Sequence, residues 1–94
     1  MIFKSEHKNI EFDKTLWLED REKRKYMVSS IINNNLIIGL TKKEVINLLG
    51  FEFNDIHSNT WSYYIGTKNI LFTSKCYLYV YFNNSNKVFK ILKK

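Results

Sequence analysis

Residues 76–82 alternate between apolar side chains and tyrosines, and this alternation constrains the fold of the chain more than any other feature. The apolar set is Leu78, Val80 and Phe82, and the tyrosine set is Tyr77, Tyr79 and Tyr81. Because successive side chains of a strand point to opposite faces of a sheet, the two sets lie on opposite faces. The pattern predicts a strand with one face suited to a core and one face lined by tyrosines.

A second alternating segment covers residues 60–65 and predicts a further strand. Its inward set is Trp61, Tyr63 and Ile65. Residues 66–69 then read as a turn, because they combine glycine, threonine and asparagine. We expect residues 70–72 to begin the next strand, with a bulge or a loop before the tyrosine-lined segment.

The tyrosine-lined strand is followed by a turn and a return strand. Residues 83–86 are rich in asparagine, which tolerates positive φ and is therefore common in turns. Residues 87–92 return as a partner strand, with Phe89 and Ile91 inward and Lys90 outward. The second half of the chain therefore predicts an antiparallel meander of three or four strands.

Residues 41–49 carry the start and stop signals of a short helix. Thr41 is suited to the N-cap, and Glu44 completes a capping box that satisfies two backbone N–H groups. The apolar stripe of this helix is formed by Val45, Leu48 and Leu49. Gly50 supplies the left-handed residue that is common after a helix. A helix this short needs packing to be stable, so we expect it to lie against the strands.

The first third of the chain predicts an arm and a second helix. Residues 1–17 show no sustained period and read as an extended arm, which Trp17 anchors to the body. Asp20 is suited to the N-cap of a helix that ends in the asparagines at residues 33–35. The basic cluster at residues 21–25 is interpreted as a solvated face of this helix.

The amino-acid composition limits the classes of protein to which this chain can belong. The 94 residues are enough for one domain, residues 1–94, and 45% of them are hydrophobic. No apolar run approaches the roughly 20 residues of a membrane-spanning helix. The single cysteine, Cys76, is interpreted as a small buried residue. The net charge of +6 accompanies eleven Asn, eleven Ile and no Pro, a bias typical of an AT-rich genome, so the charge alone does not indicate a nucleic-acid partner.

These elements together predict an α+β fold, in which two N-terminal helices pack on one face of a three- to four-stranded antiparallel meander. The opposite face is then the candidate binding surface, formed by Tyr64, Tyr77, Tyr79, Tyr81 and Lys90. Tyrosine is amphipathic and loses little side-chain entropy on binding, which favours recognition of a protein partner or formation of a homodimer. The alternative is that cross-strand tyrosines only stabilise an open sheet.

Three short motifs follow one another along residues 36–92. They are formed by Gly39, Leu40, Thr41, Glu44, Val45, Leu48, Leu49 and Gly50, then Trp61 and Tyr63, then Leu78, Val80, Phe82 and Val88. Their order and spacing resemble the SmpA/OmlA (BamE-like) family of small bacterial envelope domains. The resemblance implies two helices on one face of a three-stranded sheet, as in similar inhibitors of β-lactamases. It also implies a lipoprotein with a scaffolding role in outer-membrane β-barrel assembly.

We therefore expect a non-enzymatic protein-binding or scaffolding domain of the envelope-lipoprotein type, without cofactor or metal. No motif in the sequence places a metal-ligand set, a phosphate-binding loop or a pair of catalytic carboxylates. The alternative is a cytoplasmic nucleic-acid-binding protein or another small basic binding protein, because aromatic residues on a basic sheet are typical of RNA recognition. An export signal upstream of Met1 would place the domain in the envelope, and an authentic start at Met1 would place it in the cytoplasm.

Overall fold

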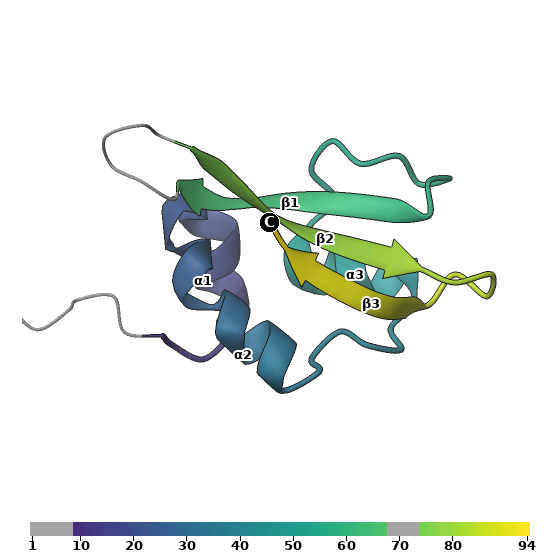
Figure 1. The fold of residues 1–94 in the computed structure, drawn as a ribbon, viewed down its shortest axis with the longest axis horizontal. Coiled ribbons are helices and arrows are strands. Elements are labelled where there is room, and N and C mark those ends of the chain that lie inside the picture. The colour runs from purple at the N-terminus through teal and green to yellow at the C-terminus, as the bar shows by residue number, and fades with distance from the viewer. Residues whose placement is uncertain (1–8, 68–73) are drawn as a thin grey trace, which may run out of the picture.

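The computed structural model describes residues 9–67 and 74–94, and it shows an α+β fold with the helices first and the strands last (Figure 1). In chain order the elements are α1 (Lys14–Glu19), the 3-10 helix η1 (Arg21–Tyr26), α2 (Val28–Asn33), α3 (Lys42–Leu49), β1 (Thr60–Thr67), β2 (Lys75–Phe82) and β3 (Val88–Lys93). The predicted start of a strand at residues 70–72 lies outside the described residues. The strands form one antiparallel sheet in the order β1-β2-β3.

Helix α3 has the boundaries and caps that the sequence predicts. The Thr41 hydroxyl accepts a hydrogen bond from the Glu44 N–H at 3.2 Å, and the Glu44 carboxylate accepts one from the Thr41 N–H at 2.8 Å. Gly50 follows the helix with a φ of 84°, which an L side chain rarely adopts. Val45 and Leu49 are fully buried, whereas Leu48 is only partly buried at the border of the core.

The sheet has one buried face and one open face, as the alternation predicts. Strand β2 alternates regularly between buried and half-exposed residues, and β1 does so up to Ile65. The inward residues of the two strands are Trp61, Tyr63, Ile65, Cys76, Leu78, Val80 and Phe82, and all of them are buried. Figure 1 looks onto the open face of the sheet, with α3 behind it.

Strand β3 departs from the predicted alternation at its first residues. Val88 lies opposite Phe82 and Lys90 lies opposite Tyr81, so Phe89 is the extra residue of a bulge. Phe89 is 55% exposed, and its predicted inward orientation is wrong. Val88 takes the inward position instead, and Ile91, opposite Val80, faces inward as predicted.

The N-terminal third is more helical and more broken than predicted. Residues 1–17 are not extended throughout, because α1 begins at Lys14, and the Asp13 carboxylate caps it by accepting a hydrogen bond from the Leu16 N–H at 3.0 Å. Asp20 is the N-cap that the sequence predicts, but it begins the short η1 rather than one long helix. Met27 separates η1 from α2, so the single predicted helix is two short ones.

The core lies between the helices and the buried face of the sheet. Trp17 is fully buried and its indole N–H donates to the Leu49 carbonyl at 3.0 Å, so it anchors α1 to the end of α3 as predicted. The basic cluster is not wholly solvated, because Arg24 is 3% exposed. The buried Arg24 corrects the interpretation of residues 21–25 as a solvated face, and its partners determine one end of the candidate site.

Candidate functional site

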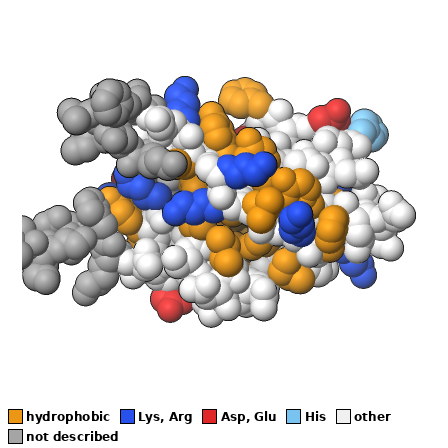
Figure 2. Space-filling view, in the orientation of Figure 1, with side chains coloured by type: hydrophobic (Ala, Val, Ile, Leu, Met, Phe, Trp, Pro, Cys, Tyr) orange, Lys and Arg blue, Asp and Glu red, His pale blue; other side chains and the backbone are white. Residues whose placement is uncertain are grey.

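The structure brings the predicted binding residues together on the open face of the sheet. We call this surface the tyrosine face, and it consists of Tyr64 on β1, Tyr77, Tyr79 and Tyr81 on β2, and Lys90 on β3. Tyr64 lies directly opposite Tyr77, and Lys90 lies directly opposite Tyr81. Figure 2 shows the face as a hydrophobic patch crossed by basic side chains.

Three of the tyrosine rings of this face form a continuous row. Tyr64 and Tyr77 meet edge to face with their centroids 6.0 Å apart, and Tyr77 and Tyr79 are tilted against each other at 6.3 Å. Aromatic pairs in these geometries stabilise each other beyond the area they bury. The row therefore presents its aromatic surface in a largely fixed arrangement.

Basic side chains lie over the rings of the tyrosine face. The Lys90 ammonium lies 5.2 Å from the centroid of Tyr81, and the Lys94 ammonium lies 5.2 Å from that of Tyr79. The Arg21 guanidinium lies 4.9 Å from the ring of Tyr64. These are cation–π distances, so the cations are held at the surface by the rings below them. Sequence reasoning missed Arg21 and Lys94 as members of this surface.

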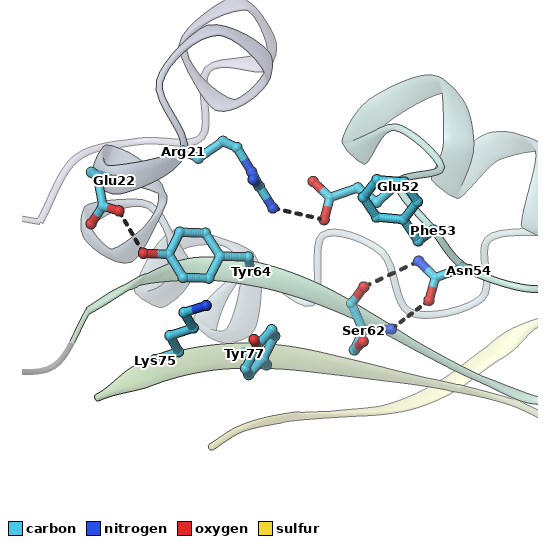
Figure 3. Close-up of a pocket in the computed structure, with 9 residues that line it drawn as sticks. All are labelled: Arg21, Glu22, Glu52, Phe53, Asn54, Ser62, Tyr64, Lys75 and Tyr77. Atoms are coloured by element: carbon cyan, nitrogen blue, oxygen red, sulfur yellow. Dashed lines mark hydrogen bonds and ion pairs between the residues drawn. The ribbon is translucent and has the colours of Figure 1, made fainter. Parts of the chain in front are cut away.

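An open pocket of about 450 Å³ adjoins the tyrosine face at the η1 end of the sheet. Figure 3 shows Tyr64 and Tyr77 side by side on adjacent strands, with Arg21 and Glu52 across the pocket from them. Phe53 also lines the pocket and is fully exposed. The pocket thus combines aromatic, acidic and basic groups in its lining.

A carboxylate holds the Tyr64 hydroxyl at one side of this pocket. The hydroxyl donates to Glu22, whose other carboxylate oxygen accepts a hydrogen bond from the Thr67 N–H at 3.3 Å. The hydrogen bond to Glu22 raises the pKa of Tyr64 to about 12, because only the protonated phenol can donate to the carboxylate. Tyr64 is therefore a neutral, oriented group at neutral pH.

Arg24 joins η1, β1 and the loop after α3 through contacts with two residues that line the pocket, Glu52 and Tyr64. Its Nε–H donates to the Trp17 carbonyl at 2.7 Å, and one of its amino groups donates to the Tyr64 carbonyl at 3.0 Å and to the Glu52 carboxylate. Glu52 also lies 3.7 Å from Arg21 and has a left-handed backbone, with a φ of 57°. The ion pair therefore holds the loop in an unusual conformation next to the exposed Phe53. No local sequence pattern marks this pair, because its members are 28 positions apart.

The net charge of the chain comes from its C-terminal part. Residues 1–55 contain nine basic and nine acidic residues, whereas residues 56–94 contain six lysines and no acidic residue. All of the formal charge of +6 therefore comes from the part of the chain that forms the three strands. This asymmetry between the two halves is a sequence signal for the site, and the composition of the whole chain hides it.

Within residues 9–67 and 74–94, no three His, Cys, Asp or Glu side chains gather in a way that could hold a metal ion. In the same residues, no helix has the length and apolar character that crossing a membrane requires. Comparison of the chain with protein-family models, with curated proteins and with solved structures gave no match.

Proposed function

We propose that this domain is a non-enzymatic binding or scaffolding module that recognises an acidic protein through the tyrosine face. The observation that carries the proposal is the row of tyrosines on a sheet that contains lysine but no acidic residue. Tyrosine and arginine are favoured at protein interfaces because they bury apolar area and still form polar contacts. The lysines and Arg21 over the rings supply the charge that attracts acidic groups to this area.

The arrangement of cations supports a protein partner over a nucleic acid. Base stacking needs accessible ring faces, but Lys90 and Lys94 already lie over Tyr81 and Tyr79. At the pocket end, Glu22 and Glu52 bring carboxylates next to Tyr64, where a phosphate backbone would be repelled. Acidic side chains of a protein can approach the lysines one at a time and avoid this end of the face.

We also propose that the fold is of the SmpA/OmlA (BamE-like) type and that the domain acts as a scaffold in the cell envelope. Support comes from the order of elements, with the capped helix α3 preceding a three-stranded antiparallel meander. Further support comes from the position of α3 behind the sheet, which leaves one sheet face for a partner. The two short N-terminal helices, α1 and η1, are additions to that pattern in this chain.

Site-specific photo-crosslinking tests the proposed surface directly. A crosslinking residue at Tyr79 is compared with one at Lys43, which is exposed on α3 behind the sheet. We expect protein adducts in lysate of the source organism at the first position but not at the second, and we expect them to persist after nuclease treatment. The double variant Lys90→Glu/Lys94→Glu should lose the adducts, whereas Lys43→Glu should keep them. Nuclease-sensitive adducts, or equal adducts at both positions, would contradict the proposal.

A further inference from the structure

The two outer edges of the sheet differ in how their outward backbone N–H and C=O groups are satisfied. On the β1 edge, side chains satisfy these groups. The hydroxyl of Ser58 accepts a hydrogen bond from the Thr60 N–H at 3.1 Å and donates one to the Thr60 carbonyl at 2.9 Å. The side-chain amide of Asn54 does the same for Ser62, accepting from its N–H at 2.9 Å and donating to its carbonyl at 3.1 Å. These side chains take the place of a neighbouring strand.

The cover of the β1 edge continues along the strand toward η1. The Tyr64 carbonyl accepts from Arg24 at 3.0 Å. The Thr67 N–H donates to Glu22 at 3.3 Å, and the Thr67 carbonyl accepts from the Lys25 ammonium at 3.3 Å. Side chains thus satisfy the outward backbone groups at both ends and the middle of β1, which is a common protection of an edge strand against unwanted pairing.

Among the residues that the structure describes, the opposite edge, on β3, is covered only at its start. The Val88 N–H donates to the Leu40 carbonyl at 2.9 Å, and the Val88 carbonyl accepts from the Gly39 N–H at 2.8 Å. The segment before α3 therefore pairs with the first residue of β3. Figure 1 shows β3 as the outermost strand on this side of the sheet.

The hydrogen-bond alternation identifies which groups of β3 point outward. Tyr77 and Lys94 exchange two backbone hydrogen bonds, of 2.8 and 2.9 Å. Because hydrogen-bonded and non-hydrogen-bonded pairs alternate in an antiparallel ladder, Ile91 and Lys93 point their N–H and C=O groups away from β2. Within residues 9–67 and 74–94, no hydrogen bond is formed to these four outward groups.

We propose that this edge, at Ile91 and Lys93, binds an extended acidic segment of the partner protein as a fourth strand of the sheet. Addition of a strand to an exposed edge uses main-chain hydrogen bonds for affinity and alternate side chains for specificity. The inference rests on the proposed function for the acidic character of the partner. Charge complementarity supports it, because the edge carries Lys90, Lys93 and Lys94 and no acidic residue.

The same charges disfavour a second copy of this chain as the occupant. Pairing of β3 with another β3 would gather the lysines of both copies along one seam, and lysine on an edge is a known deterrent to such pairing. An acidic strand would instead place carboxylates next to these lysines, so the interaction between the two strands becomes attractive. Its side chains next to Lys90 and Lys94 would lie on the open face, and the residue opposite Ile91 would be apolar, because Ile91 faces the helix side of the sheet beside Val80.

Backbone amide exchange, followed by NMR with a synthetic probe, tests the inference. The probe is an extended peptide that alternates glutamate with valine, and the matched control replaces each glutamate with lysine. We expect the Ile91 and Lys93 amides to exchange roughly tenfold or more slowly with the acidic probe, the factor of about one net hydrogen bond. The control peptide should leave both rates unchanged.

A proline variant provides a second measurement. Ile91→Pro removes an outward N–H and leaves the ladder to β2 intact, which edge strands tolerate. We expect roughly tenfold weaker binding of the acidic probe, with the amide shifts of β1 and β2 unchanged. If the variant does not fold, the exchange rates of the Ile91 and Lys93 amides in the wild-type protein still show whether the acidic probe binds at this edge.

Three outcomes would overturn the inference. In the first, the acidic probe leaves exchange at Ile91 and Lys93 unchanged. In the second, it perturbs only residues of the tyrosine face, which would leave the proposed function standing without the added strand. In the third, protection of the edge rises with protein concentration in the absence of any peptide, which would show that a second copy occupies it. Crosslinking at Tyr79 tests the proposed function separately.

Discussion

Arg24 and Glu52 form an ion pair that ties η1 to the loop after α3, and the arginine side chain is almost entirely buried. The Arg24 side chain is 3% exposed and that of Glu52 is 16% exposed. Arg21 approaches the same carboxylate from the solvent side, with its own side chain 53% exposed. One carboxylate thus has a buried and an exposed partner, which allows the two kinds of ion pair to be compared within one molecule.

Arg24→Ala should lower the free energy of unfolding by about 3–5 kcal/mol, the range for removal of one partner from a buried pair. The loss also leaves the carbonyls of Trp17 and Tyr64 without their donor. Arg21→Ala, the matched control, should cost less than about 1 kcal/mol, because exposed pairs contribute little. Urea unfolding of both variants measures the difference. Equal losses in the two variants would contradict the assignment of Arg24 as the buried member.

Leu49→Ala should lower the free energy of unfolding by about 2–5 kcal/mol, because it empties a fully buried position. Leu48→Ala should cost less, since Leu48 lies at the border of the core and is partly exposed. Thermal or urea unfolding of the two variants makes the comparison. A larger loss at Leu48 than at Leu49 would mean that α3 is rotated relative to the structure described here.

Asn54→Ala should destabilise the protein by about 1–3 kcal/mol, because it removes two hydrogen bonds from the β1 edge at Ser62. The variant should also associate more readily, since uncovered strand edges pair with one another. Asn47→Ala, at an exposed position on α3, is the control and should change stability by less than about 0.5 kcal/mol. Unfolding and analytical ultracentrifugation measure the two effects. An Asn54→Ala protein as stable and as monomeric as the control would show that the edge needs no such cover.

Alkaline pH should destabilise the fold through Tyr64. Its pKa is raised to about 12 in the folded protein, mainly by the hydrogen bond to Glu22, against 10.0 for an ordinary tyrosine. The folded state therefore keeps a proton that the unfolded chain loses, so this contribution to stability is complete below pH 10 and is lost as pH rises toward 12. The tyrosinate absorbance of the wild type, compared with that of Tyr64→Phe, should include one additional tyrosine that ionises only as the pH approaches about 12. A Tyr64 that titrates at its ordinary pKa would contradict the hydrogen bond to Glu22.

The sequence predicts the regular parts of this fold because their signals are local. The capping box of Thr41 and Glu44 and the alternation along β2 both depend on residues a few positions apart. The tyrosine face follows from that alternation once the turn at residues 83–86 brings β3 back to pair with β2, with Asn86 at a φ of 58°. Local patterns of this kind place Tyr77, Tyr79 and Tyr81 on one face without knowledge of the core.

Tertiary contacts determine the parts that local patterns miss. Arg24 is buried because Trp17, Glu52 and Tyr64 supply its partners, and the last two lie 28 and 40 positions away along the chain. Phe89 points outward because a single extra residue in β3 shifts the alternation, and an apolar pattern does not reveal a bulge.

The double variant Tyr79→Ser/Tyr81→Ser tests the central claim, that the tyrosine face is a binding surface. We expect this variant to lose the protein adducts formed from a crosslinker at Lys90, while its melting temperature falls only modestly, because the two rings are partly exposed and each cross-strand pair contributes little. The measurement therefore pairs crosslinking with thermal unfolding on the same sample. Retained adducts in the variant would show that the partner does not contact these tyrosines, and a collapse of its melting temperature would show that they belong to the core; either result would exclude the tyrosine face as the binding surface.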